Sequence, residues 1–485
     1  MLKRARDGFW EDPPCREVPE DLALRHRVFP LEASGGKVRV ATADPYDARA
    51  ADEIRYATSL VVVPELASAE DVEKALRRWY PVSADEIPAE AEAPEEEDAE
   101  GPAARLVDEV IARAFADGAS DIHVEPGKEK TTVRFRVDGV LRDILEIPKR
   151  AHATLVSRIK VMAGIDIAER RLPQDGRIRV KKPREADLRV STLPAVFGEA
   201  VVLRVLDKTK TVPKLEALGY TGENLKRIRR AAQAPYGLVL LTGPTGSGKT
   251  TTLYALLSEI VTREINVITV EDPPEYELSG VRQVAVNPKA GLTFAVALRS
   301  ILRQDPDVIM VGEIRDQETA KIAVQAAMTG HLVLSTLHTN DAASVPARLI
   351  DMGTEPYLVA SCLLCVASQR LVRLVCTSCA EDYEPPAESP VWAFFGNGRK
   401  HGFRRGKGCP RCGRTGYKGR TAAVETIFLD KAMRELIKRN ASAEELKEAA
   451  AAGGTVFLAE NAKEKAVAGL ITPEEAMRVA ASVQE

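Results

Sequence analysis

Eight consecutive residues have the spacing G-x-x-x-x-G-K-[ST] of a phosphate-binding loop (P-loop). In such a loop the backbone N–H groups surround the phosphates, the lysine reaches the β- and γ-phosphates, and the hydroxyl after it binds Mg²⁺. The pattern predicts an ATP and Mg²⁺ site in which Lys249 is catalytic and Thr250 is a metal ligand. The predicted nucleotide-binding residues here are Gly243, Pro244, Thr245, Gly246, Ser247, Gly248, Lys249, Thr250 and Thr251.

Carboxylates follow two other apolar runs that are typical of parallel strands. Residues 267–271 end in Glu271, which Asp272 follows, and residues 308–311 are followed by Gly312 and Glu313. Side chains at the carboxyl ends of parallel strands face the crevice where ligands bind, so Asp272 is predicted to contact nucleotide. Glycine stands where a metal-binding aspartate is usual. Glu271 and Glu313 are therefore both candidates to orient or deprotonate the attacking water, and the sequence does not choose between them.

Two histidines flank a further apolar run, residues 332–337. His331 precedes this run and His338 follows it. A lone histidine is usually structural, but His338 lies at the strand end where a group that senses the γ-phosphate is expected. We therefore predict that His338 belongs to the catalytic site.

Six of the seven cysteines form three C-x₂-C pairs. The last of the pairs lies in a Gly- and Arg-rich stretch, residues 402–419, that lacks a strong core pattern, and four thiolates from two pairs can bind Zn²⁺ tetrahedrally. The predicted structural zinc ligands are Cys376, Cys379, Cys409 and Cys412. The third pair, Cys362 and Cys365, lies in an apolar run interpreted as a helix, where cysteine packs as a small hydrophobic residue.

Composition limits the partners and the location. The 485 residues are 45% apolar and carry a net charge of −3, whereas nucleic-acid motors more often carry a basic excess. We therefore expect no nucleic-acid partner. No apolar run is long enough to span a bilayer, and the N-terminus lacks the apolar region of a signal peptide. The expected location is the cytoplasm, with recruitment to the inner membrane only through a partner protein.

The patterns predict a multidomain α/β protein. A small N-terminal α/β domain has strands at 38–41 and 61–63 and a helix over 69–80 capped by Ser68; without a catalytic motif, it is interpreted as a docking domain. A P-loop NTPase core of RecA-like type, with a parallel sheet, follows an α+β middle domain of PAS-like type. The predicted segments are the N-terminal domain 1–80, an acidic linker 81–101, the middle domain 102–210, the P-loop core 211–370, a zinc-binding segment 371–420 and a C-terminal helical region 421–485.

Arginines occupy the polar positions of the predicted middle-domain strands, and such a face is either simply solvated or directed at an anion. The pattern alone leaves both interpretations open. Arg315, close to Glu313 in the P-loop core, is expected to be held by Asp307 and Asp316. The middle-domain arginines are Arg134, Arg136, Arg177, Arg189 and Arg204.

The stretch Leu302-Arg-Gln-Asp-Pro-Asp-Val-Ile-Met-Val-Gly-Glu-Ile-Arg-Asp316 resembles the signature of the secretion ATPases of type II secretion and type IV pilus systems. Glu271-Asp272-Pro273 resembles the aspartate box of that family, and His331 with His338 resembles its histidine box. The likeness covers about residues 104–485 and is weaker in 25–80.

This resemblance implies a homohexamer that turns ATP hydrolysis into movement of a membrane assembly platform. It also implies that Arg177 and Arg189 close over the nucleotide. Residues 1–80 are expected to dock on the cytoplasmic domain of an inner-membrane platform protein. The expected function is to power type II protein secretion, with type IV pilus assembly as the alternative. Two rivals from other classes are a scaffold that binds nucleotide without hydrolysing it and a nucleic-acid translocase.

Overall fold

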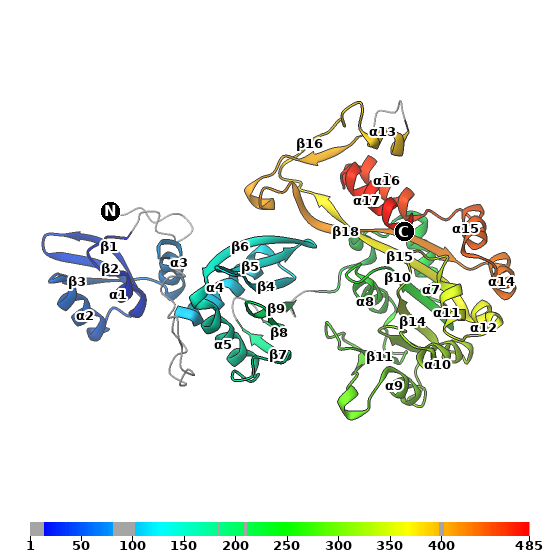
Figure 1. Ribbon diagram of the computed structural model, residues 1–485, viewed down its shortest axis with the longest axis horizontal. Coiled ribbons are helices and arrows are strands. Elements are labelled where there is room, and N and C mark those ends of the chain that lie inside the picture. The colour runs from blue at the N-terminus through cyan, green and yellow to red at the C-terminus, as the bar shows by residue number, and fades with distance from the viewer. Residues whose placement is uncertain (1–13, 81–101, 182–184, 208–210, 397–401, 485) are drawn as a thin grey trace. The chain divides into compact units, whose positions relative to one another are not determined.

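The computed structural model describes residues 14–80, 102–181, 185–207, 211–396 and 402–484. The chain divides into two compact units, Met1–Val205 and Leu206–Glu485 (Figure 1). The acidic linker expected at 81–101 lies outside the described residues. No helix in the described ranges has the length and apolar character that crossing a bilayer requires.

The N-terminal part of the first unit is a three-stranded sheet packed with helices. β1 and β2 form an antiparallel hairpin through Gly35 and Gly36, which both have positive φ, and β3 pairs parallel with β2. Ser68 Oγ accepts the N–H of Asp71 at 3.1 Å, which confirms the predicted cap. The elements are α1 (Glu20–Arg25), β1 (Val28–Ser34), β2 (Lys37–Thr42), α2 (Ala48–Thr58), β3 (Val61–Leu66) and α3 (Ala69–Trp79).

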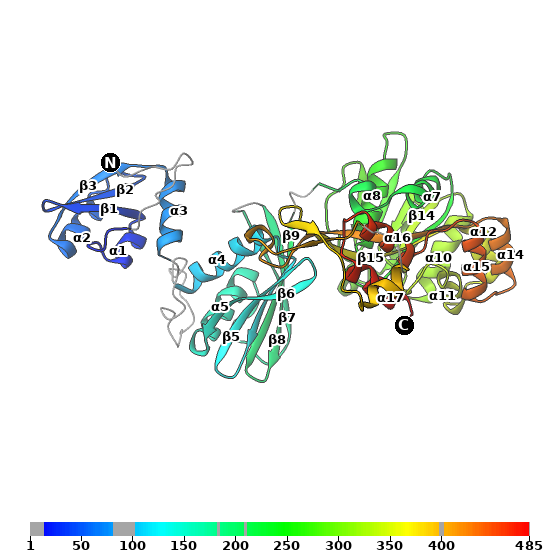
Figure 2. The ribbon, with the colours of Figure 1, turned by 90° about the horizontal axis from the view of Figure 1, so that it is seen from above.

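A six-stranded sheet in the order β6-β5-β4-β9-β8-β7 forms the middle of the chain. Apolar side chains alternate along β5, and those of α4 and α5 join them in one core, so both helices cover one side of the sheet (Figure 2). Asp138 and Gly139, both at positive φ, make the predicted β5–β6 hairpin turn. The elements are α4 (Pro102–Asp117), β4 (Asp121–Pro126), β5 (Lys130–Val137), β6 (Val140–Pro148), η3 (Lys149–Ala151), α5 (His152–Ala163), β7 (Gln174–Val180), β8 (Ala186–Ala195) and β9 (Gly198–Asp207).

The second unit is built on a seven-stranded sheet in the order β12-β11-β13-β14-β10-β15-β18. The first six strands are parallel, and β18 is antiparallel to β15. This confirms the predicted parallel core. The strands are β10 (Gly237–Thr242), β11 (Val267–Glu271), β12 (Val281–Ala285), β13 (Val308–Val311), β14 (Leu332–Leu337), β15 (Leu363–Val375) and β18 (Tyr417–Phe428).

Helices cover both faces of this sheet. Leu238 and Leu240 of β10 pack in one core with α9 and α10, and Val239 and Leu241 pack in the other core with α7 and α8. A strand buried on both sides explains the continuous apolar run that precedes the P-loop. The helices are α6 (Leu215–Leu218), α7 (Gly222–Ala232), α8 (Lys249–Ile260), η4 (Pro288–Ala290), α9 (Phe294–Ile301), α10 (Gln317–Met328), α11 (Val345–Asp351) and α12 (Pro356–Cys362).

The cysteine-rich segment is an excursion between two strands of the same sheet. The long β15–β18 pair projects toward β16, and the boundaries expected at 370 and 420 fall inside β15 and β18 (Figure 1). Cys362 and Cys365 are buried as predicted, but Cys365 lies on β15 rather than on a helix. A short buried apolar run has the same pattern in a strand as in a helix. The excursion contains β16 (Ala380–Asp382), α13 (Pro390–Phe395), β17 (Arg404–Gly406) and η5 (Pro410–Cys412).

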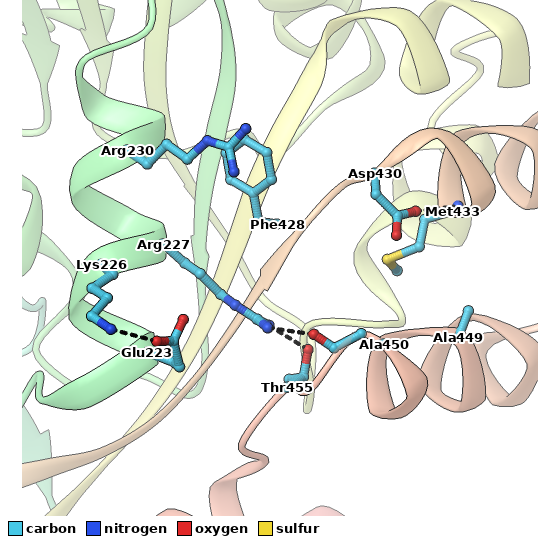
Figure 3. Close-up of a pocket in the computed structure, with 11 residues that line it drawn as sticks. Glu223, Lys226, Arg227, Arg230, Phe428, Asp430, Met433, Ala449, Ala450 and Thr455 are labelled. Atoms are coloured by element: carbon cyan, nitrogen blue, oxygen red, sulfur yellow. Dashed lines mark hydrogen bonds and ion pairs between the residues drawn. The ribbon is translucent and has the colours of Figure 1, made fainter.

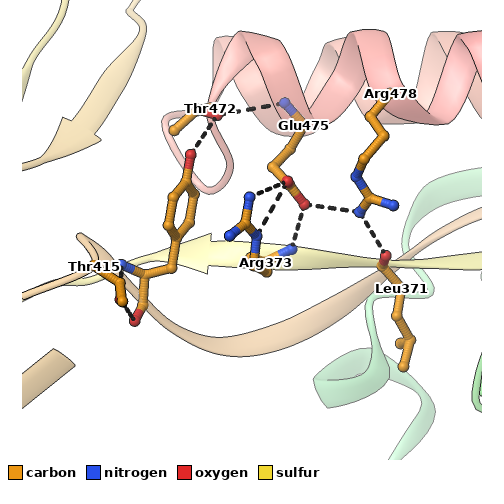
Figure 4. Close-up of polar contacts among 7 residues, drawn as sticks. Leu371, Arg373, Thr415, Thr472, Glu475 and Arg478 are labelled. Carbon is orange, nitrogen blue, oxygen red and sulfur yellow. Dashed lines mark hydrogen bonds and ion pairs between the residues drawn. The ribbon is translucent and has the colours of Figure 1, made fainter. Parts of the chain in front are cut away.

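Four C-terminal helices pack on the end of this sheet, and an ion-pair network fixes the last of them to β15. Glu475 of α17 accepts hydrogen bonds from the backbone and guanidinium of Arg373, and Arg478 bridges Glu475 to the carbonyl of Leu371 (Figure 4). Burial acts against ionisation, but the two arginines outweigh it and lower the pKa of Glu475. The helices are α14 (Lys431–Lys438), α15 (Ala443–Ala452), α16 (Leu458–Val467) and α17 (Pro473–Gln484).

Candidate functional site

The P-loop connects β10 to α8, which begins at Lys249. Gly243, Gly246 and Gly248 have φ values of 136°, 77° and 88°, which side chains rarely adopt. A Cβ on Gly243 would lie 2.5 Å from the carbonyl oxygen of Gln369, so glycine is required there for space as well. The loop therefore has the conformation that the sequence motif predicts.

Lys249 is buried within this loop. Its Nζ donates to the carbonyl oxygens of Gly243 at 2.8 Å and Pro244 at 3.1 Å. Burial lowers the pKa of Lys249 to about 8, with Glu313 acting against this shift and Arg370 adding to it. An anion beside Nζ would favour the charged form.

Other polar groups of the P-loop suit a polyphosphate. Among the described residues, Ser247 Oγ is buried without a hydrogen-bond partner. Thr250 and Thr251 follow Lys249 in the first turn of α8 and are half-buried. A helix N-terminus with inward-facing backbone N–H groups favours anions. The residues present therefore fit ATP, and Thr250 stands at the position of the motif whose hydroxyl would bind Mg²⁺.

Glu313 and His338 come together at the same sheet edge. Glu313 follows β13, and His338 follows the neighbouring β14. Glu313 Oε2 lies 3.6 Å from His338 Nε2, and its Oε1 lies 2.5 Å from Nη2 of Arg315. The P-loop follows β10, which pairs parallel with β14, so three of the predicted catalytic residues follow three adjacent parallel strands at one edge of the sheet. His331 lies at the opposite end of β14.

Arg315 is not held as the sequence analysis expected. Its ion-pair partner is Glu313 itself. Asp307 instead accepts a hydrogen bond from the backbone N–H of Asn266, and Asp316 caps α10 by accepting from the N–H of Thr319. The prediction that Asp307 and Asp316 hold Arg315 was therefore wrong, because both carboxylates satisfy backbone donors first.

Glu271 has a different environment from Glu313. Only 3% of its surface is exposed, and it accepts hydrogen bonds from the hydroxyl of Tyr254, from Thr269 Oγ1 at 2.6 Å and from Gln283 Nε2 at 3.1 Å. Burial and the carboxylate of Glu271 raise the pKa of Tyr254, so this hydroxyl stays a donor. Asp272, the next residue, is exposed. Glu271 is thus a fixed carboxylate, whereas 18% of the Glu313 side chain is exposed.

The middle-domain arginines are part of an ion-paired sheet face. Arg177 pairs with the buried Asp187, and Arg189 stands opposite Arg177 in the β7–β8 register. The other three arginines also face carboxylates. Their partners are Glu125 and Asp143 for Arg134, and Asp121 for both Arg136 and Arg204.

A separate pocket of about 420 Å³ lies between α7, the end of β18, α14 and α15 (Figure 3). Arg227 donates there to the side chain of Thr455 and the carbonyl of Gly453, both at 2.6 Å, and Arg230 lies over the ring of Phe428. Because the guanidinium of Arg227 donates its hydrogen bonds to other groups of the protein, we assign no chemistry to this pocket. Its lining residues are Glu223, Lys226, Arg227, Arg230, Phe428, Asp430, Met433, Ala449, Ala450, Gly453 and Thr455.

Two residues that the sequence analysis missed contact the P-loop. Gln369 and Arg370 lie on β15, next to β10, and Gln369 Nε2 donates to the carbonyl oxygen of Ser247 at 2.7 Å. Gln369 is 1% exposed and Arg370 is 7% exposed. Both residues lie inside β15, beside the point where β10 ends. They were missed because the apolar run just before them was interpreted as a helix, so no strand was predicted beside β10.

The four predicted zinc ligands lie together as expected. Their Sγ atoms all lie within 4.8 Å of one another. The Sγ atoms of Cys376 and Cys409 are 3.9 Å apart, and so are the Sγ atoms of Cys379 and Cys412. Tetrahedral Zn–S bonds of about 2.3 Å place sulfurs about 3.8 Å apart. Burial opposes ionisation of Cys412, but the N–H groups of Cys409 and Gly416 and the neighbouring thiols outweigh it and lower its pKa to about 6. The cluster therefore fits a structural Zn²⁺.

We predict one Zn²⁺ per chain, held by these four thiolates. Elemental analysis of anaerobically purified protein should find about one equivalent, and Cys409→Ser with Cys412→Ser should remove it. Cys362→Ser is the matched control, because Cys362 lies outside the cluster, and this variant should keep the metal. Retention of zinc by the Cys409/Cys412 double variant would contradict the assignment.

Comparison with known proteins agrees with the fold. A family model described as "Type II/IV secretion system protein" matches residues 96–478, and a model described as an MshEN domain matches residues 5–86. The crystal structure of the pilus retraction motor PilT with bound ADP aligns with a TM-score of 0.53 and 27% identity, over 76% of this chain and 96% of that chain. The X-ray structure of the Legionella pneumophila ATPase DotB aligns with a TM-score of 0.58 and 22% identity, over 80% of this chain and 98% of that chain, and supports the fold.

Curated relatives extend this likeness. The chain is 44% identical over 488 residues to the type IV pilus assembly ATPase PilB of Thermus thermophilus, covering 96% of this chain and 55% of that protein. It is 48% identical over 399 residues to the type II secretion system ATPase E of Vibrio cholerae, covering 82% of this chain and 78% of that protein. The chain therefore spans about half the length of the Thermus relative and about three quarters of the Vibrio relative. By its P-loop site, its fold and these relatives, the chain is an ATPase that belongs to the type II/IV secretion system protein family.

Proposed function

We propose that this chain hydrolyses ATP to power protein secretion by a type II secretion system. The convergence of Lys249, Glu313 and His338 at one sheet edge carries this proposal, because it supplies a phosphate-binding cation, a partly exposed carboxylate and a polar sensor in one place. Relatives at 48–50% identity are named as type II secretion proteins. Assembly of type IV pili is the second candidate, supported by the Thermus relative that aligns with 96% of this chain.

In this proposal Glu313 is the general base. Its carboxylate is partly exposed and adjoins His338 and Arg315. The carboxylate of Glu271 is occupied by three hydrogen bonds and is assigned to hold the site in shape. Lys249 neutralises phosphate charge, and His338 reports the presence of the γ-phosphate to the segment that follows it. When bound through Thr250, Mg²⁺ supplies further positive charge to the phosphates.

We also infer how the chain works in an assembly. The likeness to secretion ATPases supports a homohexamer in which Arg177 and Arg189 act on the nucleotide. Residues 1–80 have a folded core without a catalytic motif among the described residues, so we assign this domain to dock on the cytoplasmic domain of an inner-membrane platform protein. The chain would then work on the cytoplasmic side of that membrane.

Phosphate release by the assembled oligomer tests the reaction and its base. Glu313→Gln should reduce kcat by roughly 10²–10⁴, because general base catalysis is lost. The kcat of Glu271→Gln should stay at least about tenfold above that of Glu313→Gln, because an amide retains part of the hydrogen-bond network. Lys249→Ala is the inactive control. A larger loss for Glu271→Gln would make Glu271 the base, and absence of phosphate release by the unchanged protein would overturn the proposed function.

The role of the middle-domain arginines is tested by separating kcat from affinity. Arg177→Lys is chosen because it keeps a cation beside the buried Asp187. The double variant Arg177→Lys with Arg189→Ala should reduce kcat by roughly 10³–10⁵ and should change the affinity for ADP less. Arg134→Lys, on the same sheet, is the matched control and should retain activity. Unchanged turnover in the oligomeric double variant would show that these arginines only form a solvated, ion-paired face.

Removal of residues 1–100 should separate catalysis from recruitment. The truncated chain should keep measurable phosphate release, because every residue of the P-loop site lies after position 240. It should no longer co-sediment with membranes that contain the platform proteins. Co-sedimentation equal to that of the full chain would refute the docking assignment.

A further inference from the structure

Two adjacent buried polar residues on β15 contact two different parts of the nucleotide site. β15 runs parallel to β10, with Thr242, the last residue of β10, opposite Ser368. Gln369 and Arg370, the next two residues of β15, therefore lie beside the start of the P-loop. A buried amide and a buried guanidinium are costly unless hydrogen-bonded, so their partners are informative.

Gln369 supports the P-loop. Its Nε2 donates to the carbonyl oxygen of Ser247, and its Oε1 accepts from the hydroxyls of Thr252 at 3.0 Å and Tyr220 at 2.9 Å. Thr252 lies in the first turn of α8, so one amide ties the loop to the helix that it opens. The side chain of Gln369 has little freedom to move without moving the loop.

Arg370 holds the segment that follows His338. Its Nη2 donates to the carbonyl oxygen of Asn340 at 2.8 Å, and its Nη1 donates to the carbonyl oxygen of Gln369 at 3.2 Å. A Cβ on Gly243 would lie 3.1 Å from this Nη1, so the guanidinium is packed directly against the P-loop. Arg370 thus connects the backbone after His338 to the strand that supports the P-loop.

Glu425 adds a third contact from β18, where it pairs with Ser368 of β15. It is 2% exposed and accepts the N–H of Ala342 at 2.7 Å and the N–H of Leu458, the first residue of α16, at 3.1 Å. Burial raises the pKa of Glu425 to about 7, although these two N–H donors act against the shift. The segment after His338 is therefore held from two adjacent strands.

We propose that Gln369, Arg370 and Glu425 are positioning residues for hydrolysis, and that Arg370 sets the His338 segment in register with the P-loop. Gln369 fixes the loop that carries Lys249, and Arg370 and Glu425 fix the backbone on both sides of Asp341. Lys249 and His338 lie on different loops, so the two side chains address one γ-phosphate only if these loops keep their relative position. This inference rests on the proposed ATP hydrolysis.

The test compares two arginines on the same strand in the full-length oligomer. Arg370→Met should lower kcat for phosphate release by roughly 10²-fold, because small displacements of a catalytic group have effects of this size. Its Kd for ADP should change less than about threefold, because Gln369 still supports the P-loop. Arg373→Met, which removes the guanidinium paired with Glu475, is the matched control and should leave both values near those of the unchanged protein.

Two further variants distinguish positioning from general support of the fold. Arg370→Lys retains the charge but cannot bridge two carbonyls in the same way, so its kcat should lie between those of Arg370→Met and the unchanged protein. Gln369→Leu should weaken ADP binding as well as kcat, because it releases the P-loop itself.

Each other outcome overturns the inference. A kcat for Arg370→Met equal to that of Arg373→Met would show that Arg370 has no special role. A loss of ADP affinity as large as the loss of kcat would show that it only supports binding. If the unchanged protein releases no phosphate, the proposed function and this inference fail together, whereas an active protein with active Arg370 variants overturns the inference alone.

Discussion

The phosphate-binding loop depends on support from outside itself. A loop of this kind uses backbone N–H groups to bind phosphate, so those groups are not available for the regular hydrogen bonds that hold a helix or strand. The support comes from Gln369 of β15. Its carbonyl oxygen lies so close to Gly243 that no Cβ would fit there, and its side-chain amide donates to the carbonyl oxygen of Ser247. The order of strands in the sheet is therefore a condition for the shape of the site.

The two glutamates near the P-loop differ in their hydrogen bonding and exposure. Glu271 is buried and receives three side-chain donors, so its carboxylate is satisfied and immobile. Glu313 is partly exposed and its contacts are with charged or titratable groups, Arg315 and His338. A partly exposed carboxylate can be reached by water, whereas a buried one held by three donors is fixed in place. The difference follows from the neighbours and not from the residue type.

Much of the fold and part of the site followed from sequence patterns. The P-loop, the parallel strands and the clustered cysteines were predictable because each depends on local spacing. Two features were not predictable in the same way. The partners of Glu271 come from three separate elements, and the apolar run around Cys365 has the same pattern in a buried strand as in a helix. Because that run was interpreted as a helix, no strand was predicted beside β10, and the position of Gln369 and Arg370 next to the P-loop was not anticipated.

The zinc cluster is related to the P-loop through the same pair of strands. Cys376 follows directly on β15, and Cys412 ends η5 shortly before β18 begins at Tyr417, so the four thiols lie at the base of a long excursion from the sheet. Without a staple, an excursion without a large core of its own would leave the ends of β15 and β18 free to separate. A zinc ion held by these thiolates would stabilise one end of the strand that carries Gln369 and Arg370, and would thereby connect to the nucleotide site without a place in the reaction.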